Sequence, residues 1–164
     1  MPKPLPSQEE LHALFDYSPT TGLFTYKTQP NFRIKIGSVA GTVKKTGYCF
    51  IKINGSLYQA ARLAWMYVYG EDPGNLTVDH IDRNPSNNSI DNLRLATQSQ
   101  QSFNRRVINL STGIRGVTYI EKKGKYLANI HFNGKQTSKQ FDTAKEAQAY
   151  YNKLRAEHGG EFAA

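Results

Sequence analysis

The stretch 78–106, reading VDHIDRNPSNNSIDNLRLATQSQQSFNRR, constrains the fold more than any other part of this 164-residue chain. It contains an adjacent acid and histidine, a turn crowded with Asn and Ser, a short apolar strand and a polar helix. Asn and Asp side chains fold back onto their own backbone in turns, so this connection can pin the flanking strands together. The stretch therefore predicts a compact unit that places a carboxylate, an imidazole and an amide around a phosphate.

Asp79 and His80 carry the most direct chemistry of this stretch. A carboxylate is a hard ligand suited to a cation of the magnesium type, and a neutral imidazole, with an ordinary pKa near ~6.5, can take a proton from water. Hydrolysis of a phosphodiester uses both groups. Adjacent side chains on a regular strand point to opposite faces, so the pair serves one site only where the strand ends or bends. The alternative is an ordinary strand-end Asp–His pair.

The connection after His80 weighs against that alternative. Its amide and acid residues are Asn84, Asn87, Asn88, Asp91 and Asn92. We expect them to hold the strand of His80 against the next strand, residues 93–96. Thr97 then serves as the N-cap of a polar helix over 98–106. The predicted order is strand, loop, strand, helix, and a solvated Asn-rich surface loop is the alternative.

In these residues the segment resembles the HNH nuclease motif, the ββα-metal unit of phage and intron homing endonucleases. The resemblance covers about thirty residues and has a specific spacing. It implies that Asp79 is the first metal ligand, that His80 is the general base, and that Asn92 holds the loop and hydrogen-bonds near the base. It also implies one divalent cation per site, with Mg²⁺ preferred, and no small-molecule cofactor.

The second metal ligand departs from the family pattern. The motif's helix offers an asparagine at the position where this chain has Gln101, whose amide is one methylene further from the backbone. Three interpretations stay open: Gln101 binds the metal through a shifted rotamer, Asn104 one turn later replaces it, or metal affinity is reduced. An inactive form, natural or engineered, is a further interpretation.

Charge is arranged in blocks along the chain, which has 21 Lys and Arg against 13 Asp and Glu and a net charge of +8. Residues 17–70 contain seven basic residues and no acid, and residues 105–139 contain eight basic residues and only Glu121. Residues 71–104 contain five acids and two arginines. Two basic arms around an acidic centre are what we expect of a protein that holds DNA at both ends and a metal in the middle.

Other features of the sequence set limits. The single Cys49 cannot form an intrachain disulfide and is expected in the core. The first residues lack an apolar run, and no segment approaches the ~18–20 apolar residues that span a bilayer. We therefore expect no membrane partner and an intracellular, soluble protein, located in the host cytoplasm if a phage encodes it.

The pattern predicts three units: 1–70, 71–108 and 109–164. In the first, Ser7 and Glu10 form a capping box for a helix that Pro19 and Gly22 end. Asn54-Gly55 is a two-residue hairpin signal. The expected strands are 23–27, 47–53 and 57–60, followed by a buried helix over 61–69 that Gly70 closes. We expect this unit to contact DNA and its aromatic residues to be mostly core.

The last unit reads as three strands and a helix. The strands are 113–121, 125–132 and 135–141, with turns at 122–124 and at Asn133-Gly134, and Thr143 caps a helix over 144–158. Over about fifty residues this order resembles the plant Apetala/ethylene-response-factor DNA-binding domain. The resemblance implies a three-stranded antiparallel sheet that enters the major groove and reads base edges.

Alternation along these strands predicts the two faces of the sheet. Residues expected toward the helix are Val117, Tyr119, Ala128, Ile130 and Phe132. Residues expected to point outward are Thr118, Lys122, His131, Lys135, Thr137 and Lys139, together with Ile120 and Leu127, which fit less well there. The candidate DNA-binding residues are Arg105, Arg106, Arg115, Lys122, His131, Lys135 and Lys139.

These features predict an α+β protein: a small N-terminal sheet-and-helix unit, a central ββα-metal nuclease motif, and a C-terminal three-stranded antiparallel sheet packed on one helix. The function expected is that of a site-recognising, metal-dependent endonuclease that hydrolyses a phosphodiester bond in double-stranded DNA. A catalytically impaired DNA-binding protein or regulator on the same scaffold is the alternative. A structural RNA-binding protein is a third reading, without an aromatic RNA-binding motif to support it. Monomer and homodimer both stay open.

Overall fold

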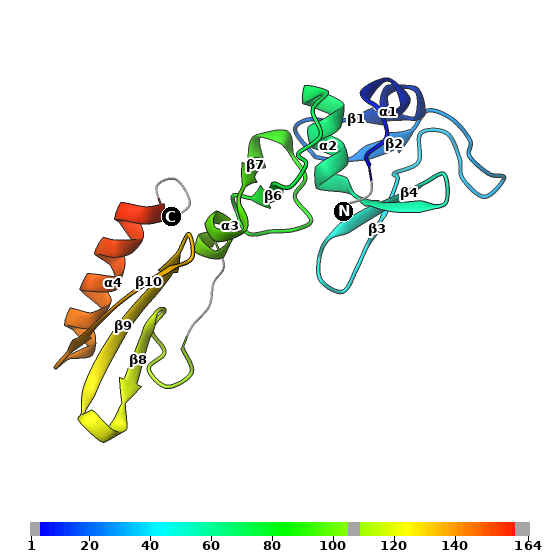
Figure 1. Ribbon diagram of the computed structural model, residues 1–164. Helices are drawn as coiled ribbons and strands as arrows, with labels where there is room; N and C mark the ends of the chain where they lie inside the picture. Colours follow the sequence, from blue (N-terminus) through cyan, green and yellow to red (C-terminus); the bar gives the residue numbers. More distant parts are fainter. Residues whose placement is uncertain (1–3, 105–108, 160–164) are drawn as a thin grey trace. The chain divides into compact units, whose positions relative to one another are not determined.

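The computed structural model describes residues 4–104 and 109–159, which fall into two compact units, Met1–Thr97 and Gln98–Ala164 (Figure 1). Small antiparallel sheets and helices make up both units, so the predicted α+β class is confirmed. The predicted divisions after residues 70 and 108 do not coincide with this boundary after Thr97.

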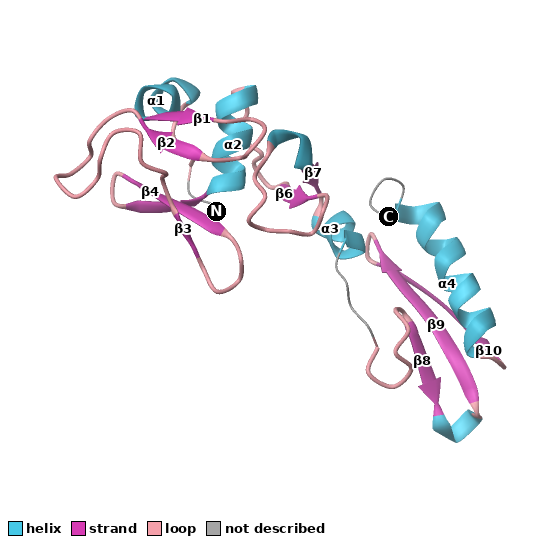
Figure 2. Cartoon of the chain, turned by 180° about the vertical axis from the view of Figure 1, so that it is seen from behind, coloured by secondary structure: helices cyan, strands magenta, loops and turns pink. Residues whose placement is uncertain are grey.

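The described residues 4–97 of the first unit form ten elements, of which the first seven precede the stretch 78–106. In chain order they are α1 (Gln8–Leu14), β1 (Phe15–Tyr17), β2 (Phe24–Tyr26), β3 (Thr42–Val43), β4 (Cys49–Ile53), β5 (Ser56–Gln59), α2 (Ala60–Tyr69), β6 (Thr77–His80), the 3-10 turn η1 (Ile90–Asn92) and β7 (Leu93–Ala96). They form three separate antiparallel sheets, β1-β2, β3-β4-β5 and β6-β7 (Figure 2).

The first helix is capped as predicted but ends earlier. Ser7 Oγ accepts a hydrogen bond from the Glu10 backbone N–H at 3.1 Å. The helix stops at Leu14, and the chain enters β1 at the next residue. The prediction that Pro19 and Gly22 end this helix is wrong. Residues Phe15–Tyr17 form strand β1, which pairs with β2 and buries alternate residues, so the helix has already ended before Pro19.

The predicted hairpin and second helix are confirmed. Asn54 and Gly55 have φ angles of +47° and +79°, the left-handed pair that a two-residue turn between twisted strands requires. Gly70 ends α2 with φ +69° and donates its N–H to the Met66 carbonyl. The turn and the cap fix where β4, β5 and α2 begin and end.

One core joins the N-terminal elements to the stretch 78–106. Leu11, Phe15 and Leu63 are buried in the same cluster as Val78 of β6 and Leu93 of β7. The β6-β7 hairpin is too small to bury its own apolar face, since an isolated two-stranded hairpin is marginally stable at best. It therefore shares the core of α1, α2 and the other two sheets, and this is why residues up to Thr97 form one unit.

The second unit contains a three-stranded antiparallel sheet of order β10-β9-β8 and one long helix. Its elements are α3 (Gln98–Asn104), β8 (Val117–Ile120), the 3-10 turn η2 (Glu121–Lys123), β9 (Lys125–Phe132), β10 (Lys135–Phe141) and α4 (Ala144–Gly159). Strand β8 is shorter than predicted, because Gly116 directly before it has a left-handed φ of +69° and the residues directly after it form the 3-10 turn η2. Thr143 and Glu146 form a reciprocal capping box at the start of α4.

The register of the sheet corrects the predicted faces. The two-residue turn Asn133-Gly134 places Lys135 opposite Phe132, Thr137 opposite Ile130 and Lys139 opposite Ala128. Directly opposed residues share a face, so these three lie on the face of α4 and the prediction that they point outward is wrong. Lys139 Nζ accordingly lies 5.6 Å from the ring centroid of Tyr150 on α4.

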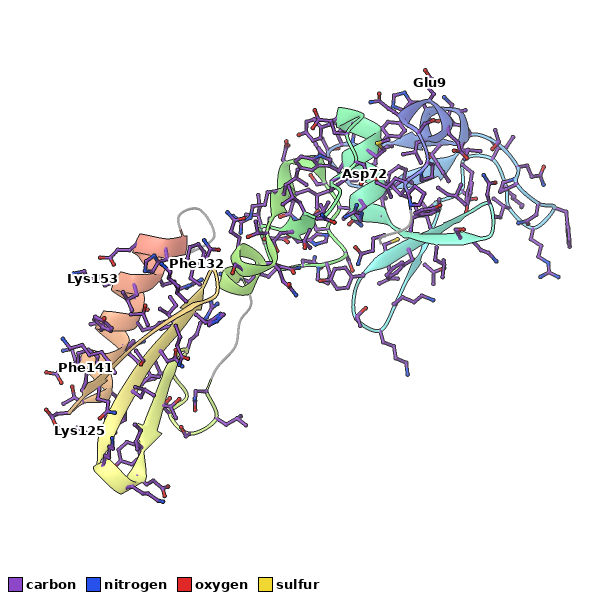
Figure 3. The ribbon with its side chains drawn as sticks, viewed as in Figure 1. Glu9, Asp72, Lys125, Phe132, Phe141 and Lys153 are labelled. Atoms are coloured by element: carbon purple, nitrogen blue, oxygen red, sulfur yellow. The ribbon has the colours of Figure 1, made fainter. Side chains whose placement is uncertain are left out.

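The helix-facing side of the sheet is otherwise as predicted. Val117, Ala128 and Ile130 are buried, whereas Tyr119 is more than one-third exposed at the edge strand. Phe132 stacks on His158 at 5.6 Å and Phe141 contacts Tyr150 at 5.2 Å (Phe132 and Phe141 are labelled in Figure 3). The outer face is the face on which the exposed His131 lies. By alternation along each strand and by the register between strands, it consists of Thr118, Ile120, Lys125, Leu127, Asn129, His131, Gln136, Ser138 and Gln140.

Candidate active site

His80 is the last residue of β6, and its side chain is almost completely buried, with 5% of the residue exposed. Strand pairing continues to this residue, which lies opposite Leu93, and the chain then turns, with the Arg83 N–H donating to the His80 carbonyl at 3.0 Å. The predicted position at a strand end is therefore confirmed. Such a position is where neighbouring side chains escape the strict alternation of a strand.

Asn88 is the partner of the imidazole. Its Oδ1 lies 3.1 Å from His80 Nε2, and its Nδ2 donates to the Ser86 carbonyl at 3.3 Å. Because the amide NH₂ faces a carbonyl, the amide oxygen faces the histidine, and Nε2 must supply the proton between them. In the neutral imidazole the lone pair is then on Nδ1. Asn88 is 4% exposed, so this contact is shielded from water.

The backbone around Asn88 is held by the β1–β2 turn. The Tyr17 hydroxyl donates to the Asn88 carbonyl at 2.7 Å, and the Ile90 N–H donates to the Pro19 carbonyl at 3.0 Å. Gly22 packs so closely that a Cβ there would lie 2.2 Å from the Asn88 carbonyl carbon. Burial, with smaller contributions from Asp91 and Tyr69, raises the pKa of Tyr17 well above its usual range, which keeps the phenol protonated as a donor.

The loop between His80 and β7 is organised by Asp82 and Asn92. Asn92 Nδ2 donates to Asp82 Oδ1 at 2.9 Å and to the Asn87 carbonyl at 2.8 Å, while its Oδ1 accepts from the Asp82 N–H at 3.0 Å. Asp82 also accepts from the Asn84 N–H and the Asn87 amide, both at 2.8 Å. Burial alone would raise the pKa of Asp82, but these hydrogen bonds outweigh it and hold the pKa below its usual value.

Asp79 is buried beside an arginine. Nε and Nη2 of Arg94 both lie 3.1 Å from Asp79 Oδ2, across the strand pair that sets these two residues opposite each other. The side chains are 6% and 12% exposed, so the pair is shielded from solvent. A carboxylate is present where the sequence predicts a metal ligand, and a guanidinium already balances its charge.

The other predicted site residues are distributed over both units. Gln101 is half-buried on α3, whose last residue is Asn104, and this helix belongs to the second unit. Arg105 and Arg106 lie outside the described residues. Arg115 is half-buried, and Lys122 and His131 are exposed on η2 and on the outer face of the sheet. Lys135 and Lys139 are exposed but belong to the face of α4.

Sequence reasoning did not single out four residues that shape this site: Tyr17, Asp82, Asn88 and Arg94. Asn88 is one of several asparagines in the loop, and nothing in the sequence distinguishes it from Asn87. The one available signal was the strand register, since a hairpin joining Asp79 to the 93–96 strand can place Arg94 opposite the acid.

Comparison with known proteins decides the family. Residues 58–103 match the family described as HNH endonuclease, and these residues contain Asp79, His80, Asn92 and Gln101. Protein 3.8 of Escherichia phage T7 is 31% identical over 100 residues, which are 60% of this chain and 83% of that protein. The chain therefore contains an HNH endonuclease domain. The matched residues include β6, the loop, β7 and most of α3, and we call this stretch the HNH motif.

Two further relatives extend the comparison. An uncharacterised HNH endonuclease, L560, of Acanthamoeba polyphaga mimivirus is 34% identical over 121 residues, 73% of this chain, and the match spans 63% of that protein's length. A solved structure of DNA binding and cleavage by the HNH homing endonuclease I-HmuI superposes loosely, with a TM-score of 0.46, 23% identity and coverage of 93% of this chain and 80% of that one. The family match ends at residue 103, so the resemblance of the C-terminal unit to the Apetala/ethylene-response-factor domain stays a prediction.

The donors at the HNH motif fit a hard cation. Within residues 4–104 and 109–159 no three His, Cys, Asp or Glu side chains gather as a metal cluster. Mg²⁺ does not need such a cluster, since it keeps several waters and uses one or two carboxylates plus a substrate phosphate. Asp79 provides one buried carboxylate of this hard type. Among the described helices, none is long and apolar enough to cross a bilayer.

Proposed function

We propose that this chain is a metal-dependent endonuclease that recognises a site in double-stranded DNA and hydrolyses one of its phosphodiester bonds. The observation that carries the proposal is the buried imidazole of His80, held through Nε2 by Asn88 at the end of β6 and next to Asp79. A buried imidazole held in one orientation is the arrangement a general base needs.

In this proposal His80 accepts a proton from the attacking water at Nδ1. Asn88 keeps the proton of the neutral ring on Nε2, and Asn92 holds the loop so that Asn88 stays in place. Arg94 fixes the Asp79 carboxylate. A divalent cation, Mg²⁺ in our proposal, would be held by Asp79 and by Gln101 or Asn104, and when bound it would offset charge on the phosphate and the leaving oxygen.

Site recognition is assigned in this proposal to the second unit, including its arginines. We propose that the outer face of the β8-β9-β10 sheet lies against base edges, and that His131 and its opposite residue Gln136, next to the Asn133-Gly134 turn, take part in this contact. Amide side chains pair with adenine in the major groove, and β-ribbons fit that groove. Lys122, Arg115, Arg105 and Arg106 would bind phosphates. We place the reaction inside a cell, in the host cytoplasm if a phage encodes the protein.

A catalytically impaired DNA-binding protein is the second candidate. The guanidinium of Arg94 already balances Asp79. In addition, Gln101, the residue that the family resemblance aligns with the second ligand, has a longer side chain than the asparagine of the motif. Both would weaken metal binding without affecting contacts to DNA.

A plasmid-cleavage assay with Mg²⁺, with and without EDTA, separates the two candidates. We expect nicked or linear plasmid with Mg²⁺ only, and loss of that product in the His80→Ala protein. Binding of the same plasmid without any cleavage over a range of Mg²⁺ and Mn²⁺ concentrations would favour the impaired binder. Absence of both binding and cleavage would contradict the proposal.

A further inference from the structure

The long β2–β3 loop, residues 27–41, and the β3-β4-β5 sheet next to it form a surface that the HNH motif does not use (Figure 2). Residues 17–70 contain no acid. Of their seven cations, Lys27 lies 3.8 Å from Asp16 and Arg62 lies 2.8 Å from Asp72. In the described part of the chain the other five form no ion pair: Arg33, Lys35, Lys44, Lys45 and Lys52. We call this surface the basic loop surface.

Phe32 at the tip of the loop is 84% exposed, the largest exposed fraction of any aromatic side chain described in the first unit. The guanidinium carbon of Arg33 lies 5.2 Å from the centroid of its ring. A single exposed apolar side chain is common on protein surfaces and needs no explanation by itself, although phenylalanine is more often buried. Here the exposed ring is combined with a stacked cation and unpaired lysines, which is a combination suited to a polyanion that also has apolar surface.

The loop holds this ring in a defined place. At the tip, Asn31 Oδ1 accepts from the Arg33 N–H at 3.0 Å, and the Ile34 N–H donates to the Asn31 carbonyl at 3.1 Å. At the base, the Gly37 N–H donates to the Tyr26 carbonyl and the Ala40 N–H to the Phe24 carbonyl, both at 2.7 Å. Phe32 is therefore presented by a hydrogen-bonded turn, so less conformational entropy is lost when it is covered.

A groove of about 400 Å³ next to the loop is also lined by both basic and apolar side chains. Arg33 and Lys52 both line it, together with the apolar side chains Ile34, Val39, Phe50 and Leu57. Along β4, Ile51 and Ile53 face the core, so Phe50 and Lys52 face the groove. The outer face of this sheet thus continues the mixture of apolar and basic groups that begins at Phe32.

Double-stranded DNA is the partner that this chemistry fits. Proteins that bind the minor groove combine Arg and Lys with apolar side chains, commonly Phe, that enter between base pairs and kink the duplex. A protein partner would need an acidic surface with an apolar pocket for Phe32. A second copy of this chain carries the same net positive charge and would be repelled. We propose that the basic loop surface binds the minor groove and that Phe32 inserts between adjacent base pairs, with Arg33, Lys35 and Lys52 on the flanking phosphates. This inference rests on the proposal that the chain binds double-stranded DNA.

Insertion unwinds the duplex, and unwinding can be measured without knowing the target site. Closed circular plasmid is relaxed by a metal-independent topoisomerase in the presence of the full chain and EDTA, and its linking number is read after the protein is removed. We expect a protein-dependent decrease in linking number. Phe32→Ala should abolish the decrease, and Phe32→Leu, which keeps an apolar wedge, should retain most of it. Leu110→Ala, which removes a fully exposed apolar side chain from the second unit, is the matched control and should change nothing.

The cations are tested by the salt dependence of binding to a mixed-sequence duplex. Each phosphate contact contributes about −0.9 to the slope of log K against log salt, so Arg33→Ala with Lys35→Ala should make the slope about 2 less negative. Lys145→Ala with Lys153→Ala removes the same charge from α4 and should have a smaller effect. Melting temperatures near that of the wild type would confirm that the variants are folded.

The outcomes distinguish this inference from the proposed function. Binding and cleavage by the wild type with no change in linking number, or with a change that persists in Phe32→Ala, would overturn the insertion and leave the nuclease intact. Equal slopes for the two double variants would overturn the phosphate contacts. No binding to DNA at all would overturn both proposals. Loss of self-association or of a protein contact in Phe32→Ala, with DNA binding unchanged, would assign the surface to a protein.

Discussion

His80 is held by side chains and backbone from three stretches of the chain. Asn88 contacts its ring, Asn92 ties the intervening loop, and Tyr17 with Gly22 fixes the backbone of Asn88 from the β1–β2 turn. The Tyr48 ring lies edge-on, 6.0 Å away. The imidazole therefore has a defined orientation before any substrate arrives, which is a condition for efficient proton transfer.

Asn88→Ala should slow cleavage while leaving DNA affinity unchanged, because the hydrogen bond orients the base and does not touch DNA. A neutral hydrogen bond contributes about 0.5–1.5 kcal/mol, so we expect a decrease in kcat of up to about tenfold. Asn88→Asp keeps an acceptor for Nε2 and should recover part of the rate. Single-turnover cleavage and binding measure the two effects. Asn84→Ala in the same loop is the control, and an equal loss of rate there would contradict the specific role of Asn88.

Asp82 should make the stability of the first unit pH-dependent in the acid range. Its pKa is lower in the folded protein than in the unfolded chain, so its contribution is complete above the unfolded pKa and is lost as the pH falls through the folded pKa. Denaturant unfolding between about pH 5 and pH 2 should therefore show a steeper loss of stability in the wild type than in Asp82→Asn. Parallel curves for the two proteins would contradict the prediction, and Asp91→Asn is the control.

Gln101→Asn should raise activity at limiting Mg²⁺, and the gain should fade at saturating Mg²⁺. A glutamine must fold back to place its oxygen where an asparagine oxygen would be, at a cost in rotamer freedom of up to ~1.5–2 kcal/mol, or about tenfold in metal affinity. A Mg²⁺ titration of the cleavage rate measures this. If Asn104→Ala removes the metal dependence and Gln101→Ala does not, the second ligand is Asn104.

At the scale of elements, the three-stranded sheet shows how a two-residue turn determines which side chains can meet a partner. The Asn133-Gly134 turn pairs Phe132 with Lys135 and so places alternate residues of β10 on the face of α4. Shifting the register by one residue would exchange both faces. The outer face is consequently rich in amides and hydroxyls, and its one lysine, Lys125, pairs with Asp142.

His131→Ala with Gln136→Ala should reduce discrimination between the preferred DNA sequence and unrelated DNA. A bidentate side-chain contact to a base contributes about 1–3 kcal/mol of discrimination, so a loss of about tenfold or more is expected. Lys135→Ala with Lys139→Ala, on the face of α4, should leave the preference unchanged. Selection from a random duplex library followed by competition binding measures it. A changed preference in the lysine pair alone would contradict the assignment of faces.

At the scale of the whole molecule, the HNH motif is not an autonomous module. Val78 and Leu93 complete a core that begins at Leu11, and the Asn-rich loop rests on Tyr17, Pro19 and Gly22. The N-terminal elements therefore support the motif structurally, in addition to the contact with DNA that we propose for the basic loop surface.

A fragment of residues 1–97 should unfold cooperatively, whereas a fragment of residues 71–108 should not fold alone. The first contains the complete shared core, and the second leaves the apolar side of the β6-β7 hairpin uncovered. Circular dichroism with urea denaturation tests both. A cooperative transition in the shorter fragment would contradict the dependence of the motif on the N-terminal elements.

Local signals in the sequence determined most of the elements. Asn54-Gly55, Asn133-Gly134, Gly70 and the capping residues Ser7 and Thr143 act within a few residues, and the structure has turns, caps and helices at these places. The resemblance of residues 78–106 to the HNH motif was likewise sufficient to predict the HNH domain, because its strand, loop, strand and helix follow one another within a short stretch.

Only the tertiary structure decided which residues meet across long separations. Tyr17 contacts Asn88 from 71 residues away, Arg94 meets Asp79 through strand pairing, and β1 replaces the continuation of α1 because Phe15 and Tyr17 are buried against β2 and α2. Each of these depends on packing energy summed over the whole core. A local pattern does not contain that sum, so the partner of His80, the balance of charge on Asp79 and the faces of the C-terminal sheet could be read only from the folded chain.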